Sequence, residues 1–541
     1  MSLTLSKELI EATGVPRLLA IAAHTFHHRA DREVEIDIGN TTDDELRQIV
    51  RAANKVDDAK TGRAADAILK AREGAFGHPI PNFKAFEGML TQFLRHELID
   101  GWIYARGEDG KLNPELVTGV HYEPGNQRDK TPPRVKVFTT YYGKANRERG
   151  GTTVGVERES YSFDPHEVTK KRIADALAEN GLYKETPALK AEYVASMERH
   201  ASVTALGFAK QYRMNGAPFH YETEHYRKRG TPIQNRRVIH DLDSPAYAAV
   251  QNHADSVLFK QSADGTGAIP EHPVIRVFDL KTHEFYWVHA DFLSPHEYDK
   301  SLGQKLVLPA SHRDLLDVLT TDLDAFTSDI IEGKSAGNII LAKGAPGLGK
   351  TLSAEIFSEL IERPLYSMHS GSLGTSASEI AKNLQVFFQR AKRWGCVLLL
   401  DEADVFVIQR GDNIQQNAIV AEFLRTMEYM DTLLFMTTNR PDDIDDAIIS
   451  RCAAIIQYEV PGAKDAAAIW RVMAAQFETQ LDDSLIASLL KLFPTIAPRD
   501  IKMLLRLALR VSHKHGEPLS IDVFRRCAMF RAIHIEQETT Q

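Results

Sequence analysis

A short glycine-rich segment carries the residues best suited to chemistry. Residues 338–343 form an apolar run typical of a buried parallel strand, and residues 352–362 have helical spacing. Between them the chain satisfies the pattern GxxxxGK[ST], which turns backbone N–H groups around phosphate oxygens at the beginning of a helix. The competing interpretation is a glycine-rich turn without a ligand, and the flanking elements disfavour it. The predicted nucleotide-binding residues are Gly344, Ala345, Pro346, Gly347, Leu348, Gly349, Lys350, Thr351 and Leu352.

Two side chains of this segment have distinct predicted roles. We expect Lys350 to reach the β- and γ-phosphates of a nucleotide such as ATP, and the Thr351 hydroxyl to bind Mg²⁺.

A second apolar run, residues 396–400, ends in Asp401 and Glu402. Acidic residues at the carboxyl end of a parallel strand lie at the crevice where such sheets bind ligands. We therefore expect Asp401 to hold Mg²⁺, directly or through water, and Glu402 to orient and deprotonate the attacking water. Alternatively, the two carboxylates cap the next helix.

Three later residues complete the predicted site. The strand-like run 433–438 delivers Asn439 to the same edge of the sheet, where its side chain can hydrogen-bond both the attacking water and the γ-phosphate; the alternative is a turn-forming asparagine. Arg451 precedes the run 454–458, and we expect it to contact the γ-phosphate of a neighbouring subunit in a ring, unless it is a solvated surface arginine. Arg499 begins a helix of the C-terminal tail and can reach back to the phosphates, or form a salt bridge at the helix start.

The elements that must position these residues divide the chain into four predicted parts. Residues 1–100 have apolar residues at helical spacing, and residues 101–305 mix alternating and helical patterns, as in an α+β region. Residues 313–461 contain the strand-loop-helix pattern, and residues 462–535 are helical throughout.

Two β-hairpins are predicted within residues 101–305. The first pairs the alternating run 135–141 with 154–156 and has a polar, basic tip at residues 144–151. The second pairs residues 274–278 with residues 285–288.

Composition excludes several classes of protein. The chain has 541 residues, and its 65 basic and 74 acidic side chains give a net charge of -9, which disfavours general binding to polyanions. The three cysteines have no CxxC spacing, so neither a zinc site nor a disulfide framework is predicted, and a reducing cytoplasm fits best. The sequence lacks the run of about 18 uncharged apolar residues that a membrane helix needs, so we predict a cytoplasmic protein without membrane contact.

Taken together, residues 313–533 resemble the AAA+ ATPases and, within them, the AAA family proper. The matching stretches are GAPGLGKT, LLLDEAD, FMTTNRPDDIDDAIISR and the APRD of the helical tail. The resemblance implies an α/β P-loop fold with a five-stranded parallel sheet and a C-terminal helical lid. It also implies a ring, most often hexameric, with ATP bound between subunits. The residues described above then correspond to Walker A, Walker B, sensor 1 (Asn439), the arginine finger (Arg451) and sensor 2 (Arg499).

Two departures from the family pattern bear on the client. Residues 370–377 read SGSLGTSA, without the aromatic residue by which many relatives grip a threaded polypeptide. The common RPGRFD ending is replaced by residues 450–452, SRC, which leaves one obvious arginine finger. These differences put threading by the usual grip in doubt.

The leading prediction is a Mg²⁺-dependent ATPase that forms a homo-oligomeric ring and remodels a macromolecular client, a protein rather than a nucleic acid. The first alternative is a nucleic-acid motor, because residues 401–404 spell DEAD and the basic segment 134–149 contains Tyr141 and Tyr142. A second RecA-like domain and a Ser-Ala-Thr motif, which helicases of that class need, are not visible in the sequence. The second alternative is a scaffold that binds ATP to assemble and scarcely hydrolyses it.

Overall fold

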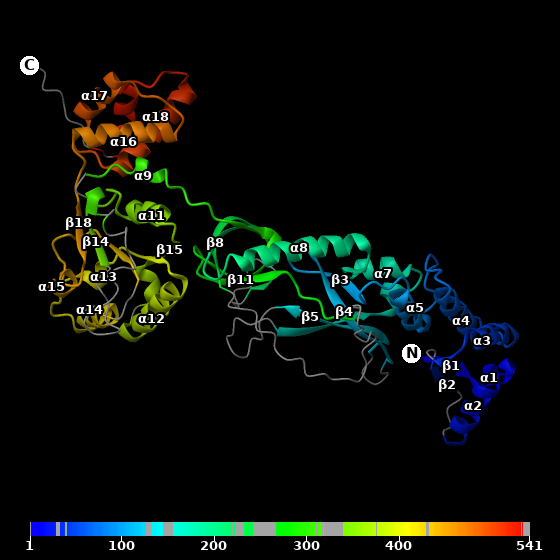
Figure 1. Ribbon diagram of the computed structural model, residues 1–541. Helices are drawn as coiled ribbons and strands as arrows, with labels where there is room; N and C mark the ends of the chain where they lie inside the picture. The colour runs from blue at the N-terminus through cyan, green and yellow to red at the C-terminus, as the bar shows by residue number, and fades with distance from the viewer. Residues whose placement is uncertain are drawn as a thin grey trace, which may run out of the picture. The chain divides into compact units, whose positions relative to one another are not determined.

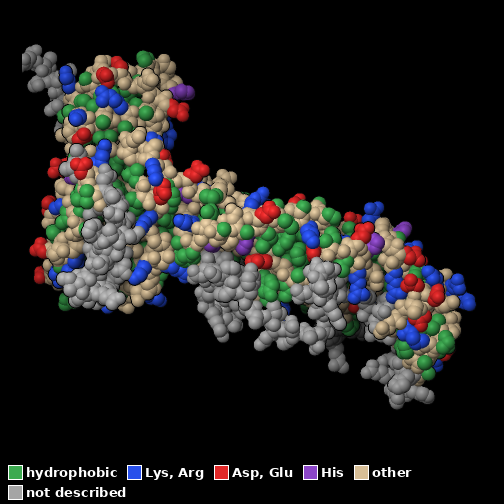
Figure 2. All heavy atoms as spheres, in the orientation of Figure 1, with side chains coloured by type: hydrophobic (Ala, Val, Ile, Leu, Met, Phe, Trp, Pro, Cys, Tyr) green, Lys and Arg blue, Asp and Glu red, His purple; other side chains and the backbone are tan. Residues whose placement is uncertain are grey.

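The chain divides into two compact units in a computed structural model (Figure 1). The first unit comprises Met1–Phe208 and Arg213–Ser294, and the second comprises Ala209–Tyr212 and Pro295–Gln541. The structure describes residues 2–28, 33–37, 40–125, 131–143, 155–218, 220–221, 232–241, 267–309, 312–315, 318, 339–374, 376–428, 432–531 and 533. The predicted basic tip at residues 144–151 lies outside these residues. None of the helices in the described ranges is long and apolar enough to span a membrane. On the face shown in Figure 2, basic and acidic side chains are interspersed.

The first unit begins with five helices and a short ribbon. The ribbon pairs two antiparallel strands and was not predicted from the sequence. The elements are β1 (Ser2–Ser6), α1 (Lys7–Thr13), α2 (Pro16–His28), β2 (Glu33–Asp37), α3 (Asp43–Lys55), α4 (Ala59–Arg72) and α5 (Phe83–Arg95). Helix α3 shows why its sequence folds locally: the Thr42 hydroxyl accepts the Glu45 backbone N–H, and the Glu45 carboxylate accepts the Thr42 backbone N–H.

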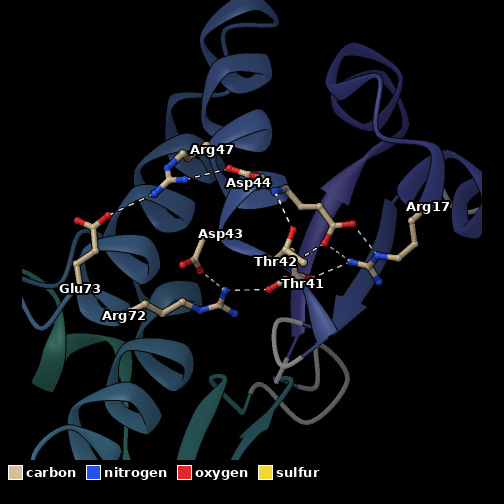
Figure 3. Close-up of polar contacts among 9 residues, drawn as sticks. Arg17, Thr41, Thr42, Asp43, Asp44, Arg47, Arg72 and Glu73 are labelled. Carbon is tan, nitrogen blue, oxygen red and sulfur yellow. Dashed lines mark hydrogen bonds and ion pairs between the residues drawn. The ribbon is translucent and has the colours of Figure 1, made fainter.

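A network of ion pairs joins these helices (Figure 3). Arg17 of α2 donates to both carboxylate oxygens of Glu45, at 2.7 and 2.9 Å, and this hydrogen bonding lowers the pKa of Glu45 to about 2. Arg72 of α4 donates to Asp43 at 2.6 Å and to the Thr41 carbonyl at 2.9 Å. The start of α3 is therefore fixed to α2 by Arg17 and to α4 by Arg72, in addition to the apolar core that the helices share.

A five-stranded antiparallel sheet follows, in the order β6-β5-β4-β3-β7. Its elements and the helices around it are β3 (Trp102–Arg106), β4 (Leu112–Glu123), β5 (Arg134–Gly143), β6 (Gly155–Phe163), α6 (Pro165–Val168), α7 (Ile173–Glu179), β7 (Leu182–Lys184) and α8 (Pro187–Ala205). Strands β5 and β6 pair from Val135↔Phe163 to Gly143↔Gly155, which confirms the first predicted hairpin. The helical region and this sheet share one hydrophobic core.

A six-stranded sheet has the order β13-β8-β10-β11-β12-β9. It is built from β8 (Gln211–Gly216), β9 (His220–Tyr221), β10 (Ile233–His240), β11 (Val274–Asp279), β12 (Phe285–His289) and β13 (Leu293–Pro295), with the short helix η3 (Ala290–Phe292) before the last strand. Strands β11 and β12 pair antiparallel, with Val274 opposite His289, as the second predicted hairpin requires.

The second unit is built on a five-stranded sheet of order β15-β16-β17-β14-β18, in which every pairing is parallel. This confirms the predicted α/β fold. The strands are β14 (Ile339–Gly344), β15 (Leu365–His369), β16 (Val397–Asp401), β17 (Leu434–Thr438) and β18 (Ala454–Tyr458). The helices are α9 (Leu302–Lys305), α11 (Lys350–Leu360), η4 (Ser370–Leu373), α12 (Ala377–Trp394), α13 (Asp404–Val407), α14 (Ile414–Met427) and α15 (Asp446–Ile449). Strands β14, β16 and β17 are interior, and their near-continuous burial explains their apolar sequences.

The C-terminal part is a helical lid, as predicted. It consists of α16 (Ala463–Gln476), α17 (Asp483–Leu492), α18 (Pro498–His515) and α19 (Ile521–Met529). These helices enclose a hydrophobic core of their own, in which Trp470 and Phe524 meet edge to face with ring centroids 5.6 Å apart. Pro498 at the first position of α18 fits the preference of proline for helix starts.

One buried carboxyl group makes the stability of the first unit depend on pH. Glu115 of β4 is 3% exposed, and burial raises its pKa from 4.5 to about 7; hydrogen bonds from Thr139 and Tyr161 partly oppose the rise, and nearby Glu159 adds to it. Between these pH values the native state binds a proton that the unfolded state has lost. The free energy of unfolding therefore falls as pH rises through this range.

We expect the opening free energy of β4, β5 and β6 to be higher at pH 5 than at pH 8. The two pKa values, 4.5 and about 7, correspond to about 3 kcal/mol as an upper figure. Native-state hydrogen exchange, corrected for the intrinsic rates, measures the difference. A Glu115→Gln variant should lose most of this pH dependence, whereas Glu123→Gln, on the exposed end of the same strand, should keep it. Equal pH dependence in Glu115→Gln and the unaltered protein would contradict the assignment.

Candidate nucleotide-binding site

The loop between β14 and α11 has a backbone that only glycine allows. Gly344 and Gly347 have φ angles of 146° and 84°. A Cβ atom on Gly344 would lie 2.3 Å from the Tyr458 carbonyl oxygen, and one on Gly347 would lie 2.9 Å from Cβ of Arg499. Because α11 begins at Lys350, the loop ends at the N-terminal N–H groups of that helix. The predicted strand-loop-helix arrangement is therefore present, and it suits an anion.

Lys350 is the first residue of α11; its side chain folds back against this loop and the residue is only 7% exposed. Its Nζ atom donates to the carbonyl oxygens of Gly344 and Ala345, at 2.7 and 2.8 Å, and to Oδ1 of Asn439 at 2.9 Å. Burial lowers the pKa of Lys350, while Asp401 and Asp404 partly restore it. All three partners are neutral, so an anionic phosphate oxygen would be a more favourable partner for the ammonium group. Lys350 and Asn439, 89 residues apart, are in direct contact, as expected for two parts of one site.

A second cluster centres on one carboxylate oxygen at the end of β16. Oδ1 of Asp401 accepts the Thr351 hydroxyl at 2.9 Å and the Thr437 hydroxyl at 2.6 Å. Thr351 and Asp401, both predicted to bind Mg²⁺, are thus adjacent. Hydroxyl and carboxylate oxygens are the hard ligands that Mg²⁺ prefers, so these residues fit that ion.

Glu402 follows directly and has an unusual backbone. Its φ angle is 53°, in the left-handed region that few residues other than glycine adopt, and its side chain is exposed. The Glu402 N–H donates to the Thr437 hydroxyl at 3.0 Å, so one hydroxyl both contacts Asp401 and fixes the strained residue after it. Such strain is typical of residues positioned for function.

Two residues that contact the candidate site, Thr437 and Asp404, were missed by the sequence analysis. Thr437 reads as part of a buried strand, and only its contacts reveal its role. Asp404 accepts the Thr438 hydroxyl and the Asn439 backbone N–H, the latter at 3.0 Å, and so orients the end of β17. The DEAD tetrapeptide of residues 401–404 was the one sequence signal that pointed to Asp404.

The two arginines lie in different places. The Arg499 backbone N–H donates to the Gly347 carbonyl at 3.1 Å, so the first turn of α18 lies against the glycine-rich loop. Arg451 donates to Glu428 at 2.6 Å and to the Ala447 carbonyl at 3.1 Å. Within the described residues, Arg451 makes no hydrogen bond to Lys350, Asp401 or Asn439, so the structure does not bring it together with them.

The remaining predicted residues differ in exposure. Leu348 is buried in the core beneath the sheet, whereas Ala345, Pro346 and Leu352 are exposed, Leu352 by 44%. A helix-start residue contributes through its backbone N–H, so an exposed Leu352 side chain is compatible with that role. The loop after β15 forms η4, and Thr375 of the predicted client-facing segment lies outside the described residues.

The comparisons with known proteins concern this same region. Residues 340–460 match the family model described as "ATPase family associated with various cellular activities (AAA)". An uncharacterized AAA family ATPase of Sinorhizobium fredii is 30% identical over 141 residues, which cover 25% of this chain and 42% of that protein. A putative 26S proteasome regulatory subunit homolog of Methanothermobacter marburgensis is 28% identical over 172 residues, covering 30% and 46%. The ATP-dependent zinc metalloprotease FtsH of Protochlamydia amoebophila is 32% identical over 125 residues, covering 20% and 13%.

The chain thus spans less than half the length of each of these relatives. One solved chain, from the structure of the E. coli MS115-1 HORMA:CdnC:Trip13 complex, aligns with 43% of this chain and 92% of its own length, at a TM-score of 0.36 and 16% identity. The family match coincides with the parallel sheet and the loop built around Lys350. The ATPase region of this chain, residues 340–460, therefore belongs to the AAA family of ATPases.

Proposed function

We propose that the protein hydrolyses ATP with Mg²⁺ in a ring of identical subunits and uses the reaction to remodel a protein client. The observation that carries the proposal is the meeting of Lys350, Asp401 and Asn439 at the carboxyl ends of three adjacent parallel strands. Ligands bind at this edge in open parallel sheets. The proposal therefore assigns this edge to the triphosphate.

Each residue has a task that follows from its position. Lys350 exchanges its carbonyl and Asn439 partners for oxygens of the β- and γ-phosphates. Thr351 and Asp401 would hold Mg²⁺, which neutralises charge on the phosphates when bound. Gly347 and the N-terminal N–H groups of α11 bind phosphate oxygens through the backbone.

Glu402 is the proposed general base. Its exposed carboxylate follows the strained backbone that Thr437 fixes, and it orients and deprotonates the attacking water. Asn439, at the end of the neighbouring strand β17, orients the same water and contacts the γ-phosphate. The Thr437 hydroxyl is a positioning group, because it touches Asp401 and the Glu402 backbone and no reacting atom.

Arg451 supports assembly into a ring. Its guanidinium is held by Glu428 within the same chain and becomes available to a neighbour once this ion pair opens. An arginine supplied by an adjacent subunit stabilises charge on the transferred phosphoryl group. The proposal therefore requires at least two subunits per working site, and a closed ring, most often hexameric in the AAA family, satisfies this for every subunit.

A protein client is favoured over a nucleic acid. Two relatives are named as a proteasome regulatory subunit homolog and a zinc metalloprotease. The visible surface of the described residues mixes basic and acidic side chains without one continuous basic patch (Figure 2). The thiols Cys396, Cys452 and Cys527 are free, in keeping with the proposed cytoplasmic location.

A Glu402→Gln substitution should abolish hydrolysis and preserve nucleotide binding. The amide has the shape of the carboxylate but cannot accept the proton, so we expect kcat to fall at least about 100-fold with the Kd for ATP changed less than about threefold. Phosphate release and titration of a fluorescent ATP analogue measure the two quantities. Glu422→Gln, on α14, alters a carboxylate paired with Arg425 outside the site and should behave as the unaltered protein. Surviving hydrolysis in Glu402→Gln would show that another group is the base.

The same variant separates the proposed clients. Stalled in ATP, Glu402→Gln should retain its client in a pull-down, and nuclease treatment should leave the recovered material in place. Loss of the material after nuclease would instead support a nucleic-acid motor. An unaltered protein that assembles in ATP and releases no phosphate would support the ATP-assembled scaffold.

Replacing Thr437 with valine should lower kcat about tenfold and leave the Kd for ATP within about threefold. Valine keeps the shape and removes the hydroxyl that accepts the Glu402 N–H and donates to Asp401. Thr437→Ser should restore most of the rate. Thr426→Val is the matched control, because the Thr426 hydroxyl donates to the Glu422 carbonyl within α14 and, among the described residues, contacts neither Asp401 nor Glu402. An unchanged kcat in Thr437→Val would mean that the hydroxyl has no part in positioning Glu402.

Arg451→Ala and Glu402→Gln subunits should restore activity to each other. Each variant is expected to be inactive by itself, but an Arg451→Ala site keeps its Glu402 and can take the arginine of a Glu402→Gln neighbour, so about a quarter of the sites should work in an equal mixture assembled together, as phosphate release measures. Arg471→Ala, which removes an exposed lid arginine paired with Asp483, should keep the activity of the unaltered protein. A mixture of Arg451→Ala and Glu402→Gln that releases no phosphate would argue against catalysis across an interface.

A further inference from the structure

A small polar cavity lies on one face of the sheet β6-β5-β4-β3-β7, in the unit that precedes the ATPase region. Its volume is about 180 Å³. The side chains that matter most in its lining are Asn113 and Glu115 of β4, Tyr141 of β5, Glu159 and Tyr161 of β6, and His272. A water molecule occupies about 30 Å³ in the liquid, so the cavity can hold a ligand group of a few heavy atoms.

The strand register gathers these residues. Asn113 and Glu115 alternate with Pro114, so they point to the same face of β4. On the adjoining strands, Thr139 lies opposite Glu159, which places the β5 and β6 residues beside them. His272 comes from a distant part of the chain and stacks on Tyr141, with ring centroids 3.8 Å apart and an interplanar angle of 6°. The stacked rings form a flat wall of the cavity.

The buried side chain of Asn113, unpaired within the described ranges, indicates that the cavity holds a ligand. Its side chain is 2% exposed, and neither Nδ2 nor Oδ1 has a hydrogen-bond partner among the residues that the structure describes. A buried carboxamide without partners is costly, and native proteins rarely leave both of its polar atoms unsatisfied. A ligand that accepts from Nδ2 and donates to Oδ1 would satisfy both atoms.

The carboxylates indicate the charge of this ligand. Glu115 accepts the Thr139 hydroxyl at 2.5 Å and the Tyr161 hydroxyl at 2.9 and 3.0 Å, which leaves further acceptor capacity on a carboxylate. Glu159 and Glu108 line the exposed rim. The cavity therefore favours a cation with several N–H donors.

Two further lining residues are an arginine and a histidine. Arg106 donates to the Tyr183 hydroxyl at 2.8 Å and lies over that ring, 5.6 Å from its centroid, so its guanidinium is held against Tyr183. The His272 Nε2–H donates to the Pro114 carbonyl at 3.0 Å, and Nδ1 of the neutral ring is then an acceptor. Within the described ranges, no set of three His, Cys, Asp or Glu residues is placed to hold a metal ion, which favours an organic cation.

We propose that this cavity binds an organic ammonium group with a hydrogen-bond acceptor beside it, as in the α-ammonium and first carbonyl of an amino-acid amide or of a polypeptide amino terminus. The ammonium donates to Glu115 and to Oδ1 of Asn113, and the neighbouring carbonyl accepts from Nδ2 of Asn113. The proposal is independent of nucleotide hydrolysis, because all these residues belong to the first unit.

The full-length protein is titrated with glycinamide and with N-acetylglycinamide, and binding is followed by saturation-transfer NMR. We expect saturable binding of glycinamide and at least tenfold weaker binding of N-acetylglycinamide, which lacks the charge. Glu115→Gln and Asn113→Ala should each weaken glycinamide binding at least tenfold. Glu123→Gln, a carboxylate on the same strand that pairs with Lys136 outside the cavity, should bind normally. Phosphate release by each variant verifies that the rest of the protein is intact.

A second pair of probes identifies the source of the ammonium group. A peptide with a free amino terminus and a fluorescent label at its carboxyl end is compared with its acetylated form by anisotropy. Tenfold preference for the free form supports a polypeptide amino terminus, and binding of glycinamide without either peptide supports a small free amine.

Two results would overturn the proposal: equal affinity for glycinamide and N-acetylglycinamide, or full affinity in Glu115→Gln. If the cavity variants fail to fold, hydrogen exchange of the unaltered protein decides the matter. Glycinamide must then slow hydrogen exchange of the β4 amides around Asn113 more than N-acetylglycinamide does. Equal exchange rates with the two compounds would refute the site.

Discussion

A single carboxylate oxygen, Oδ1 of Asp401, holds the ATPase site together. It accepts a hydroxyl from Thr351 at the beginning of α11 and another from Thr437 near the end of β17. Three elements that are far apart in the sequence are thereby fixed to one point at the edge of the sheet. Because Thr437 also accepts the Glu402 N–H, the residue proposed as general base takes its orientation from the same point.

A comparable arrangement organises the neighbouring contact between Lys350 and Asn439. Lys350 is stabilised by carbonyl groups of its own loop and by an amide from β17, and Asp404 in turn fixes the backbone of Asn439. The two clusters share β17, which contributes Thr437, Thr438 and Asn439 in succession. The site is therefore preorganised by hydrogen bonds between strand ends, and a bound triphosphate needs only to exchange partners within it.

The parts of the structure that sequence reasoning could predict are those with local causes. The loop around Lys350 follows from glycine conformation, and the parallel sheet follows from apolar runs separated by helices. Thr437 was not predictable, because a threonine in a buried strand has no pattern of its own and its role depends on the register with Asp401. The cavity of the first unit was equally hidden: Asn113, Tyr141 and His272 come together only through strand pairing. The β1 and β2 ribbon escaped notice because its two strands are short and separated by two helices.

The order of strands in the ATPase sheet has a consequence for how such a protein can change over evolutionary time. The groups assigned to phosphate, Mg²⁺ and water follow β14, β16 and β17, and each of these strands pairs with another strand on both sides. Strands β15 and β18 are the two edge strands of this sheet. Arg451 precedes β18, and the loop 370–377, which has no aromatic residue, follows β15. Mutations that adapt the molecule to a different neighbour or a different cargo can therefore accumulate at the margins while the reaction centre stays as it is.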